Sequence, residues 1–314
     1  KKLWTYNFFY MRFKYFGQKL KSRFACLYAQ SQAFIPVSPR LLCHIDRKLQ
    51  AQYERTGLTY AQILCVYKRS YLSDQLKLVL NQSILPTTLY IYQNNSHVCA
   101  LPPFGIAGLQ NICFTHNRTW NAYYHGRFYA ALMSRESNVI IWDDDIQPGK
   151  KWNEYTLSKS KQYGDAIVTA NGRILSVDNF QETSCINETV ADEPFYRGQA
   201  VSDTIVDYGG HSWTFPRYLL NTMASIDPPS LQNSEDFHIS AAAYLKNKIL
   251  TVMPAQEPHN HAFCPEYYLS GSRAWDRHAS YLSKDNSDWK KTRSSIIRTW
   301  ITRHGYIPLE SRSG

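Results

Sequence analysis

Three adjacent aspartates, Asp143, Asp144 and Asp145, directly follow the apolar run NVIIW and precede a Pro-Gly turn. Neighbouring carboxylates repel one another, whereas Asn, Ser or Gly would make a polar turn without that cost. Carboxylate oxygens at a strand end suit Mg²⁺ or Mn²⁺, which share such ligands readily with substrate phosphates. The triplet therefore predicts a divalent cation site, and the alternative interpretation is a solvated acidic turn.

A second acidic pair, Glu235 and Asp236, opens the segment SEDFHISAAAYLKNK. We expect Ser234 to cap a helix here, which places both carboxylates in a first turn where the helix dipole stabilises negative charge. Such a carboxylate can act as a general base toward a hydroxyl group, or it can be ordinary N-terminal helix charge. His259 and His261 follow a later apolar segment, and a neutral imidazole is a good ligand for Mn²⁺.

The apolar segments around these residues predict an alternation of strands and helices. Strands are expected at 62–67, 87–96, 111–114, 138–142, 166–169 and 249–254, with a further apolar stretch at 205–215. Helices are expected at 73–85, 121–136, 234–248 and 289–304, with another starting at 216–220, and 178–197 is a polar excursion. Alternation of this kind favours an open α/β sheet, whose ligands collect outside the carboxyl ends of the strands. The aspartate triplet lies at such an end.

Composition and charge bound the possible partners. Hydrophobic residues make up 44% and aromatic residues 14%, as in a globular chain with a sizeable core. The formal net charge of +10 indicates anionic partners, such as phosphates, an acidic membrane surface or nucleic acid. The start KKLWTYNFFYMRFKYFGQKLKSRF suits a peripheral membrane contact or a segment packed against the domain.

Cysteine usage and hydropathy bear on the compartment. The seven cysteines form no CxxC pair, so neither a zinc knuckle nor a redox dithiol is indicated, and their odd number favours a reducing environment. We find no apolar run of membrane-spanning length and no signal-peptide pattern. The expected location is the cytoplasm or the cytoplasmic face of a membrane rather than a secretory lumen.

Four features, in order, resemble the GT-A fold glycosyltransferases of the family 2-like group. They are VYKR and QNNS in an opening β-α-β unit, GRF before the acidic strand, WDDD on that strand, and SEDFH followed by PHNH. The resemblance spans about Gln62 to His261, and it implies a Rossmann-like open, mostly parallel sheet flanked by helices. The catalytic domain would cover 59–270, with an aromatic and basic extension at 1–58 and a basic extension at 271–314.

The resemblance also implies the reaction: an inverting transfer of a sugar from a nucleotide diphosphate, preferably a UDP-sugar, to a glycan or other hydroxyl acceptor, assisted by Mn²⁺ or Mg²⁺. The residues it assigns to the donor are Val66, Tyr67 and Asn94 around the base, Arg69 beside them, and Arg127, Asp143 and Asp144. For the cation it implies Asp145 as the main ligand, joined by Asp143 and by His259, with His261 as the alternative.

On the acceptor side, the resemblance implies that Asp236 is the general base and that Glu235 positions the acceptor. His211 and Trp213, in YGGHSWTF, would border the acceptor cleft, and the two glycines would let the backbone approach a sugar closely. Trp213 can stack on a sugar ring or pack in the core. VYKR and GRF depart from the usual pattern, and the lack of a QxxRW motif favours single transfers over processive synthesis.

Two other functional classes stay open on the sequence. A nucleotidyltransferase or another metal-dependent phosphoryl-transfer enzyme would also use an aspartate triplet, and it would release pyrophosphate instead of a nucleoside diphosphate. A non-enzymatic binder of nucleic acid or membranes would use the positive charge. The basic clusters lie mainly at the two ends of the chain, so we expect no nucleic-acid partner.

Overall fold

The computed structural model describes residues 48, 51–52, 54, 57–66, 72–94, 112–117, 122–144, 146–176, 187–190, 202–256, 260–263 and 286–312. Its strands are β1 (Tyr60–Val66), β2 (Thr88–Asn94), β3 (Ile112–Asn117), β4 (Asn138–Trp142), β5 (Ile167–Thr169), β6 (Arg173–Ser176), β7 (Asn187–Val190), β8 (Thr204–Val206), β9 (Ser212–Pro216) and β10 (Thr251–Met253). Its helices are α3 (Leu72–Leu80), α4 (Gly126–Ala131), α5 (Trp152–Gln162), α6 (Tyr218–Ala224), α7 (Glu235–Asn247) and α8 (Asn286–His304), with short 3₁₀ turns η2 (His261–Phe263) and η4 (Leu309–Ser311).

Eight strands form one sheet in the order β3-β2-β1-β4-β9-β5-β10-β8, and β6 pairs separately with β7. Strands β3, β2, β1 and β4 run parallel to one another, as β5 and β10 do. The expectation of an open, mostly parallel α/β sheet is confirmed. The reversal of β9, which runs antiparallel to both β4 and β5, was not expected. Because Ser212 pairs with Trp142, the turn that leads into β9 meets the carboxyl end of β4.

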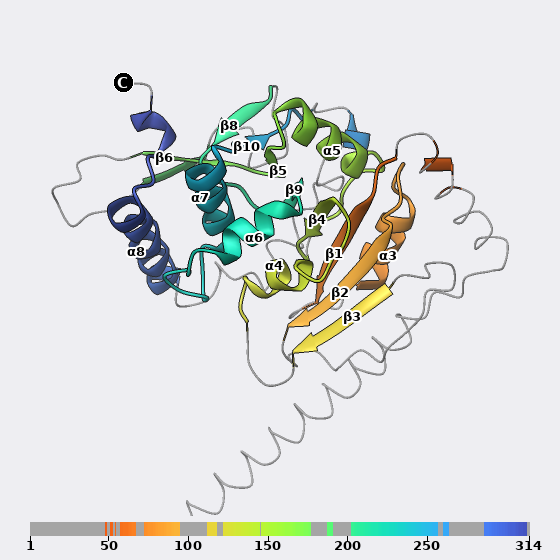
Figure 1. The fold of residues 1–314 in the computed structure, drawn as a ribbon, viewed down its shortest axis with the longest axis horizontal. Coiled ribbons are helices and arrows are strands. Elements are labelled where there is room, and N and C mark those ends of the chain that lie inside the picture. The colour runs from red at the N-terminus through yellow and green to blue at the C-terminus, as the bar shows by residue number, and fades with distance from the viewer. Residues whose placement is uncertain are drawn as a thin grey trace, which may run out of the picture.

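Helices cover both faces of this sheet (Figure 1). Alternate residues of a strand point to opposite faces of the sheet, and the side chains of β1 follow this rule. Tyr60 and Leu64 belong to a buried cluster shared with α3 and α5. Ala61 and Ile63 belong to a second cluster shared with α4, α6 and α7. The central strands are therefore buried on both sides, and chemistry is confined to their ends.

Helix α8, from the end of the chain, packs against α7 (Figure 1). Ile297 and Trp300 of α8 share a third buried cluster with Phe237 of α7 and with Tyr208 and Tyr306. The ring of Phe237 meets those of Tyr208 and Tyr306 edge to face, with centroids 5.5 and 5.0 Å apart. The start of α7 is thus held between the sheet and the C-terminal helix.

Some predicted elements differ from the observed ones. The helix expected at 121–136 is reduced to α4. Tyr123 has a left-handed φ of 46°, which a right-handed helix does not allow, and the Asn94 side chain bonds to the main chain of Ala122 and Tyr123. The polar excursion at 178–197 includes β7. Most of the predicted N-terminal extension lies outside the described residues, although Gln52 exchanges two hydrogen bonds with the main chain of Leu85. None of the described helices is apolar over a length that would cross a membrane.

Candidate active site

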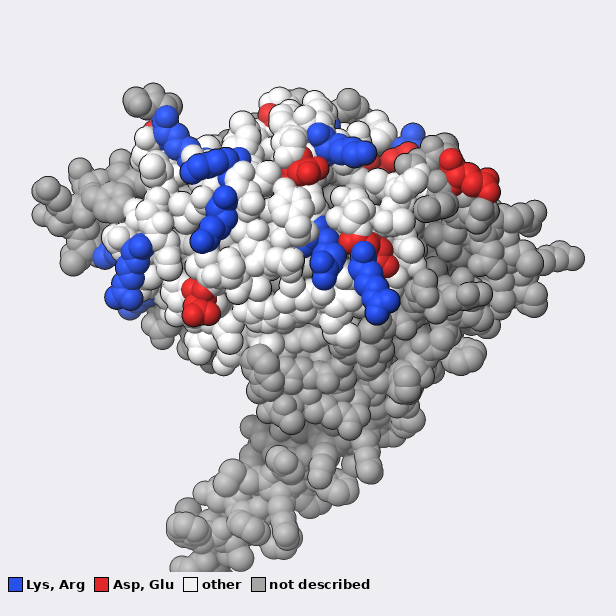
Figure 2. Space-filling view, in the orientation of Figure 1, with Lys and Arg blue, Asp and Glu red and all other residues white. Residues whose placement is uncertain are grey.

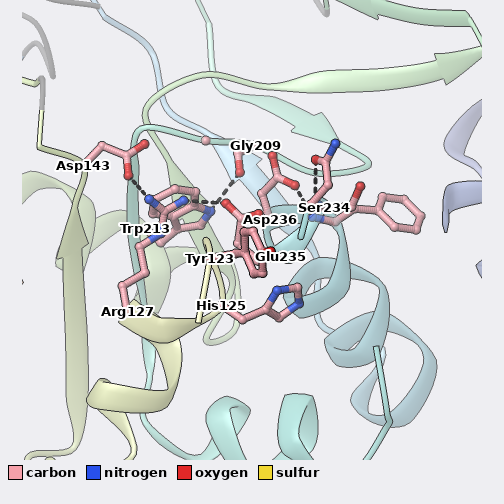
Figure 3. A network of polar contacts seen from close by, with 12 residues as sticks. Tyr123, His125, Arg127, Asp143, Gly209, Trp213, Ser234, Glu235 and Asp236 are labelled. Atoms are coloured by element: carbon pink, nitrogen blue, oxygen red, sulfur yellow. Dashed lines mark hydrogen bonds and ion pairs between the residues drawn. The ribbon is translucent and has the colours of Figure 1, made fainter. Parts of the chain in front are cut away.

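Asp143 is held at the carboxyl end of β4 from three sides. Its N–H donates to the carbonyl of His211 over 2.9 Å, and its own carbonyl accepts from the Gln75 side chain over 2.6 Å. Its carboxylate forms an ion pair with Arg127 of α4 (Figure 3). Helix α3, helix α4 and the turn before β9 therefore jointly fix the first residue of the aspartate triplet.

Arg127 joins the two acidic motifs. One guanidinium nitrogen pairs with Asp143, and another lies 2.5 Å from the Glu235 carboxylate at the start of α7. The Arg127 side chain is 11% exposed, and its guanidinium carbon lies 4.5 Å from the centre of the Trp213 ring. Burial alone would lower the pKa of Arg127, but Asp143 and Glu235 outweigh that effect and raise it. The guanidinium is therefore a permanent positive charge between two carboxylates.

Helix α7 begins at an unusual backbone position. Ser234 is the N-cap residue, as expected, but its φ of 65° is left-handed and its side chain makes no capping hydrogen bond. His211, at the turn before β9, also has a left-handed φ of 66°. Non-glycine residues with such values store strain, which persists where the surrounding structure imposes it. Both strained residues border the paired acidic motifs.

Glu235 is a buried carboxylate whose charge is only partly compensated. Burial raises the pKa of Glu235 to about 7. The positive charge of Arg127 lowers this pKa, but the negative charge of Asp236 raises it again. A carboxyl group that titrates near neutrality can exchange a proton under ordinary conditions. This perturbation was not foreseen, because it arises from burial in the folded chain rather than from residue type.

Asp236 is engaged by a residue that sequence analysis missed. Its Oδ2 lies 2.9 Å from a guanidinium nitrogen of Arg293 on α8, and its Oδ1 accepts from the N–H of Phe237 over 2.7 Å. The Asp236 side chain is 15% exposed, compared with 7% for Glu235. Arg293 lies within a generally basic helix, and blue Lys and Arg side chains are seen over the place of this helix at the lower left of Figure 2. Nothing in that pattern distinguishes Arg293 from the exposed cations around it.

Carboxylates outnumber guanidinium groups in this part of the fold. Arg127 and Arg293 pair with Asp143, Glu235 and Asp236, and Asp144 follows Asp143 in the chain. Burial raises the pKa of the Cys65 thiol on β1, and the charges of Arg127, Asp143, Asp144 and Glu235 all act on that thiol. These charges therefore act near the carboxyl end of β1.

The proposed metal ligands are only partly within view. Among the described residues, no three His, Cys, Asp or Glu side chains are grouped to hold a metal ion. Asp145 and His259, expected to complete the site, lie outside these residues, as do Tyr67 and Arg69. Their roles in cation and donor binding stay predictions.

Three other predicted site residues, Val66, Asn94 and Trp213, are buried next to the site. Val66 is 3% exposed and belongs to the core beside α3. Asn94 accepts hydrogen bonds from the Tyr92 hydroxyl and the Ala122 N–H, both at 3.1 Å. Trp213 is 1% exposed, and its ring N–H donates to the carbonyl of Gly209 over 2.8 Å. In this structure Trp213 packs in the core beneath Arg127, so it presents no open face for a sugar.

Two buried histidines lie beneath the start of α7. His125, which precedes α4, has its Nδ1 3.0 Å from the Leu231 carbonyl, and its Nε2 lies 3.3 Å from Nδ1 of His238. Burial lowers the pKa of His125 to about 4 and that of His238 to about 3. Both rings are therefore neutral at pH 7, and they couple α4, which carries Arg127, to α7, which carries the acidic pair.

Together these contacts bring a strand-end aspartate, an arginine and a helix-start acid pair into one site. Such a site can bind an anionic group through an arginine, and the partly exposed carboxylate of Asp236 can accept a proton from a hydroxyl. No known family profile matches the chain, and no curated protein matches it in sequence.

Proposed function

We propose that the protein is a metal-dependent glycosyltransferase that moves a sugar from a nucleotide diphosphate, with UDP preferred, to a hydroxyl acceptor with inversion. The observation that supports it most is the bridge that Arg127 makes between Asp143 and Glu235. The family resemblance assigns Asp143 to the donor and Glu235 to the acceptor. They lie 16 and 108 positions from Arg127 in the chain, and both meet its guanidinium. A finer assignment of the sheet to the GT-A fold is part of this proposal.

On the donor side, Arg127 and the aspartates at the end of β4 would receive the diphosphate and ribose. Arg127 pairs with two carboxylates, but a guanidinium has five N–H donors. It can therefore also donate a hydrogen bond to a phosphate when a donor enters. A divalent cation held by Asp143 and Asp145 would neutralise the charge that develops on the departing diphosphate. The Gln75 side chain donates to the Asp143 carbonyl, and the His211 carbonyl accepts from the Asp143 N–H, so both keep Asp143 in place during this exchange.

On the acceptor side, Asp236 would take the proton of the attacking hydroxyl. Its carboxylate accepts two described hydrogen bonds and is partly exposed, and a carboxylate has about four lone-pair sites, so it can accept one more from a hydroxyl. Its place in the first turn of α7 stabilises the negative charge. Glu235, paired with Arg127, would orient the acceptor and the donor relative to each other. The acceptor would be a glycan or glycoconjugate.

A screen of UDP-, GDP- and dTDP-sugars, with Mn²⁺ or Mg²⁺ and with a chelator, tests this function. We expect one class of donor to be hydrolysed slowly with release of the nucleoside diphosphate, and we expect the chelator to stop it. Asp145→Ala should abolish turnover and weaken metal-assisted binding of the nucleotide, measured by calorimetry. Asp236→Asn should lower the turnover rate by about 100-fold or more but leave nucleotide binding intact.

Asp227→Asn is the matched control, since Asp227 is an exposed aspartate in the segment between α6 and α7. It should behave like the unmodified protein. Release of pyrophosphate would point to nucleotidyl transfer instead. Full activity in Asp236→Asn would show that another group is the base, and lack of any nucleotide binding would reject the proposal.

A further inference from the structure

Arg293 reaches the candidate base from a helix that the sequence resemblance does not include. It lies on α8, 57 positions after Asp236, and its Nη2 is 2.9 Å from Asp236 Oδ2. Its other terminal nitrogen, Nη1, donates to Asn233 Oδ1 over 3.1 Å. Asn233 in turn accepts from the N–H of Ser234 over 2.7 Å. One guanidinium therefore fixes both the Asp236 carboxylate and the strained turn that precedes it.

The surroundings of Arg293 keep it in this position. Arg293 is 6% exposed, and its guanidinium carbon lies 4.8 Å from the centre of the Tyr208 ring. Neighbouring residues of the same helix, Ile296 and Ile297, are buried against α7. A planar guanidinium over an aromatic ring, on a packed helix, has little freedom to turn away.

The two arginines of the site divide the acid pair between them. Arg127 takes Glu235, and Arg293 takes Asp236, each from a different element and each above an aromatic ring. Adjacent carboxylates repel each other, so without its own cation the Asp236 side chain would be free to turn toward solvent. With Arg293 in place, one oxygen is tied to α8, and the carboxylate keeps a fixed direction.

We propose that Arg293 is a positioning residue, which orients the Asp236 carboxylate for the acceptor hydroxyl and so makes α8 part of the active site. This inference rests on the proposed function. Arg293 binds Asp236 and Asn233, which belong to the acceptor side of the proposed site. Its loss should therefore affect the rate of the chemical step and leave donor binding unchanged.

The test compares Arg293→Ala and Arg293→Lys with Arg298→Ala, which removes an exposed arginine from the same helix. The measurements are kcat and KM for hydrolysis of the preferred nucleotide-sugar, UDP affinity in Mn²⁺ and the midpoint of urea unfolding. We expect Arg293→Ala to lower kcat by about 10- to 100-fold with KM and UDP affinity unchanged. Arg293→Lys should recover part of the rate, because an ammonium keeps the charge but not the planar fork.

Guanidinium rescue separates positioning from simple stabilisation. Millimolar guanidinium chloride should restore part of kcat in Arg293→Ala, whereas equal urea should not, and neither should change Arg298→Ala. A kcat equal to that of the unmodified protein, a raised kcat, or a loss that follows unfolding and is not restored by guanidinium would overturn the inference. If Arg293→Ala does not fold, Arg293→Lys is compared with Arg298→Ala instead. A lower kcat with unchanged KM in Arg293→Lys alone would support the inference, and an unchanged kcat would overturn it.

These outcomes are distinct from failure of the proposed function. If the unmodified protein neither bound nor hydrolysed any of the nucleotide-sugars, the glycosyltransferase proposal would fail, and the role of Arg293 would fail with it. If the unmodified protein turned over a donor but Arg293→Ala did so equally well, the function would stand and the positioning role alone would be rejected.

Discussion

Arg127 divides one positive charge between carboxylates from two elements, and this leaves Glu235 undercompensated. Asp143 competes for the same guanidinium, and Asp236 adds a negative charge next to Glu235 in the chain. Glu235 is 5% exposed, so water contributes little to its stabilisation. The folded chain therefore holds the proton of Glu235 more tightly than the unfolded chain does.

This difference predicts a pH-dependent contribution to stability. Burial raises the pKa of Glu235 from 4.5 to about 7, so between these values the folded state binds more protons than the unfolded state. The contribution is fully present below pH 4.5 and is lost as the pH rises through about 7, on the order of 3 kcal/mol in all. Urea unfolding of the unmodified protein and of Glu235→Gln is measured from pH 4.5 to 8. The free energy of unfolding of the unmodified protein, minus that of Glu235→Gln, should fall as the pH rises. The exposed Asp227→Asn serves as control, and a constant difference for Glu235→Gln would contradict the expectation.

Residue types were predictable from the sequence, whereas their partners were not. The aspartate triplet and the acid pair are visible as clusters at the ends of apolar segments. The pairing of Arg127 with Glu235 spans 108 positions, and that of Arg293 with Asp236 spans 57. Long-range ion pairs depend on how elements pack in three dimensions. The resemblance therefore pointed to Arg127 as a donor residue but not to its pairing with Glu235, and no local pattern distinguished Arg293 from exposed arginines.

At the scale of elements, the reversed strand β9 shapes the site. It places the turn at 209–211 beside the carboxyl end of β4, where the His211 carbonyl accepts from Asp143. Periodicity reveals that a segment is apolar, but it does not give the direction in which a buried strand runs. The mostly parallel sheet was therefore predicted, but its antiparallel strands, β9 and β8, were not.

The two glycines of this turn differ in the space around them, which gives a matched pair of substitutions. A Cβ on Gly209 would lie 2.1 Å from the main-chain oxygen of Asn171 and from the Thr169 hydroxyl, whereas the nearest atom to a Cβ on Gly210 is Asn171 Oδ1 at 3.1 Å. We expect Gly209→Ala to destabilise the fold by about 1 to 3 kcal/mol or more, because backbone has to move. Gly210→Ala should cost clearly less.

Urea unfolding of both variants measures this difference. Equal costs would contradict the packing argument. The result also bears on the sequence-based idea that these glycines admit a sugar. Gly209 packs against Thr169 of β5 and against the main chain of Asn171, so close packing within the fold already accounts for this glycine.

At the scale of the whole molecule, the end of the chain closes over the edge of the sheet. Asp207, which follows β8 and has a side chain with no exposed surface, accepts hydrogen bonds from the Tyr306 hydroxyl at 2.8 Å and the Leu309 N–H at 2.9 Å. Its other oxygen accepts from the Leu175 N–H over 2.7 Å. This buried carboxylate ties the segment after α8 to β6, and so it helps hold α8 against α7.

The dependence of α8 on this contact can be tested with Asp207→Asn. Burial raises the pKa of Asp207, and the neutral amide removes that cost of a buried charge. However, its NH₂ group has to face the N–H of Leu175 or that of Leu309, and one buried donor then loses its acceptor at a cost of about 1 to 3 kcal/mol. Urea unfolding should show this loss, and limited proteolysis should cut the segment after α8 sooner than in Asp227→Asn. Since α8 carries Arg293, the same variant should also lower kcat for nucleotide-sugar hydrolysis while UDP affinity is kept. An unchanged stability and proteolysis pattern would mean that the packing of α8 against α7 alone holds the C-terminal helix in place.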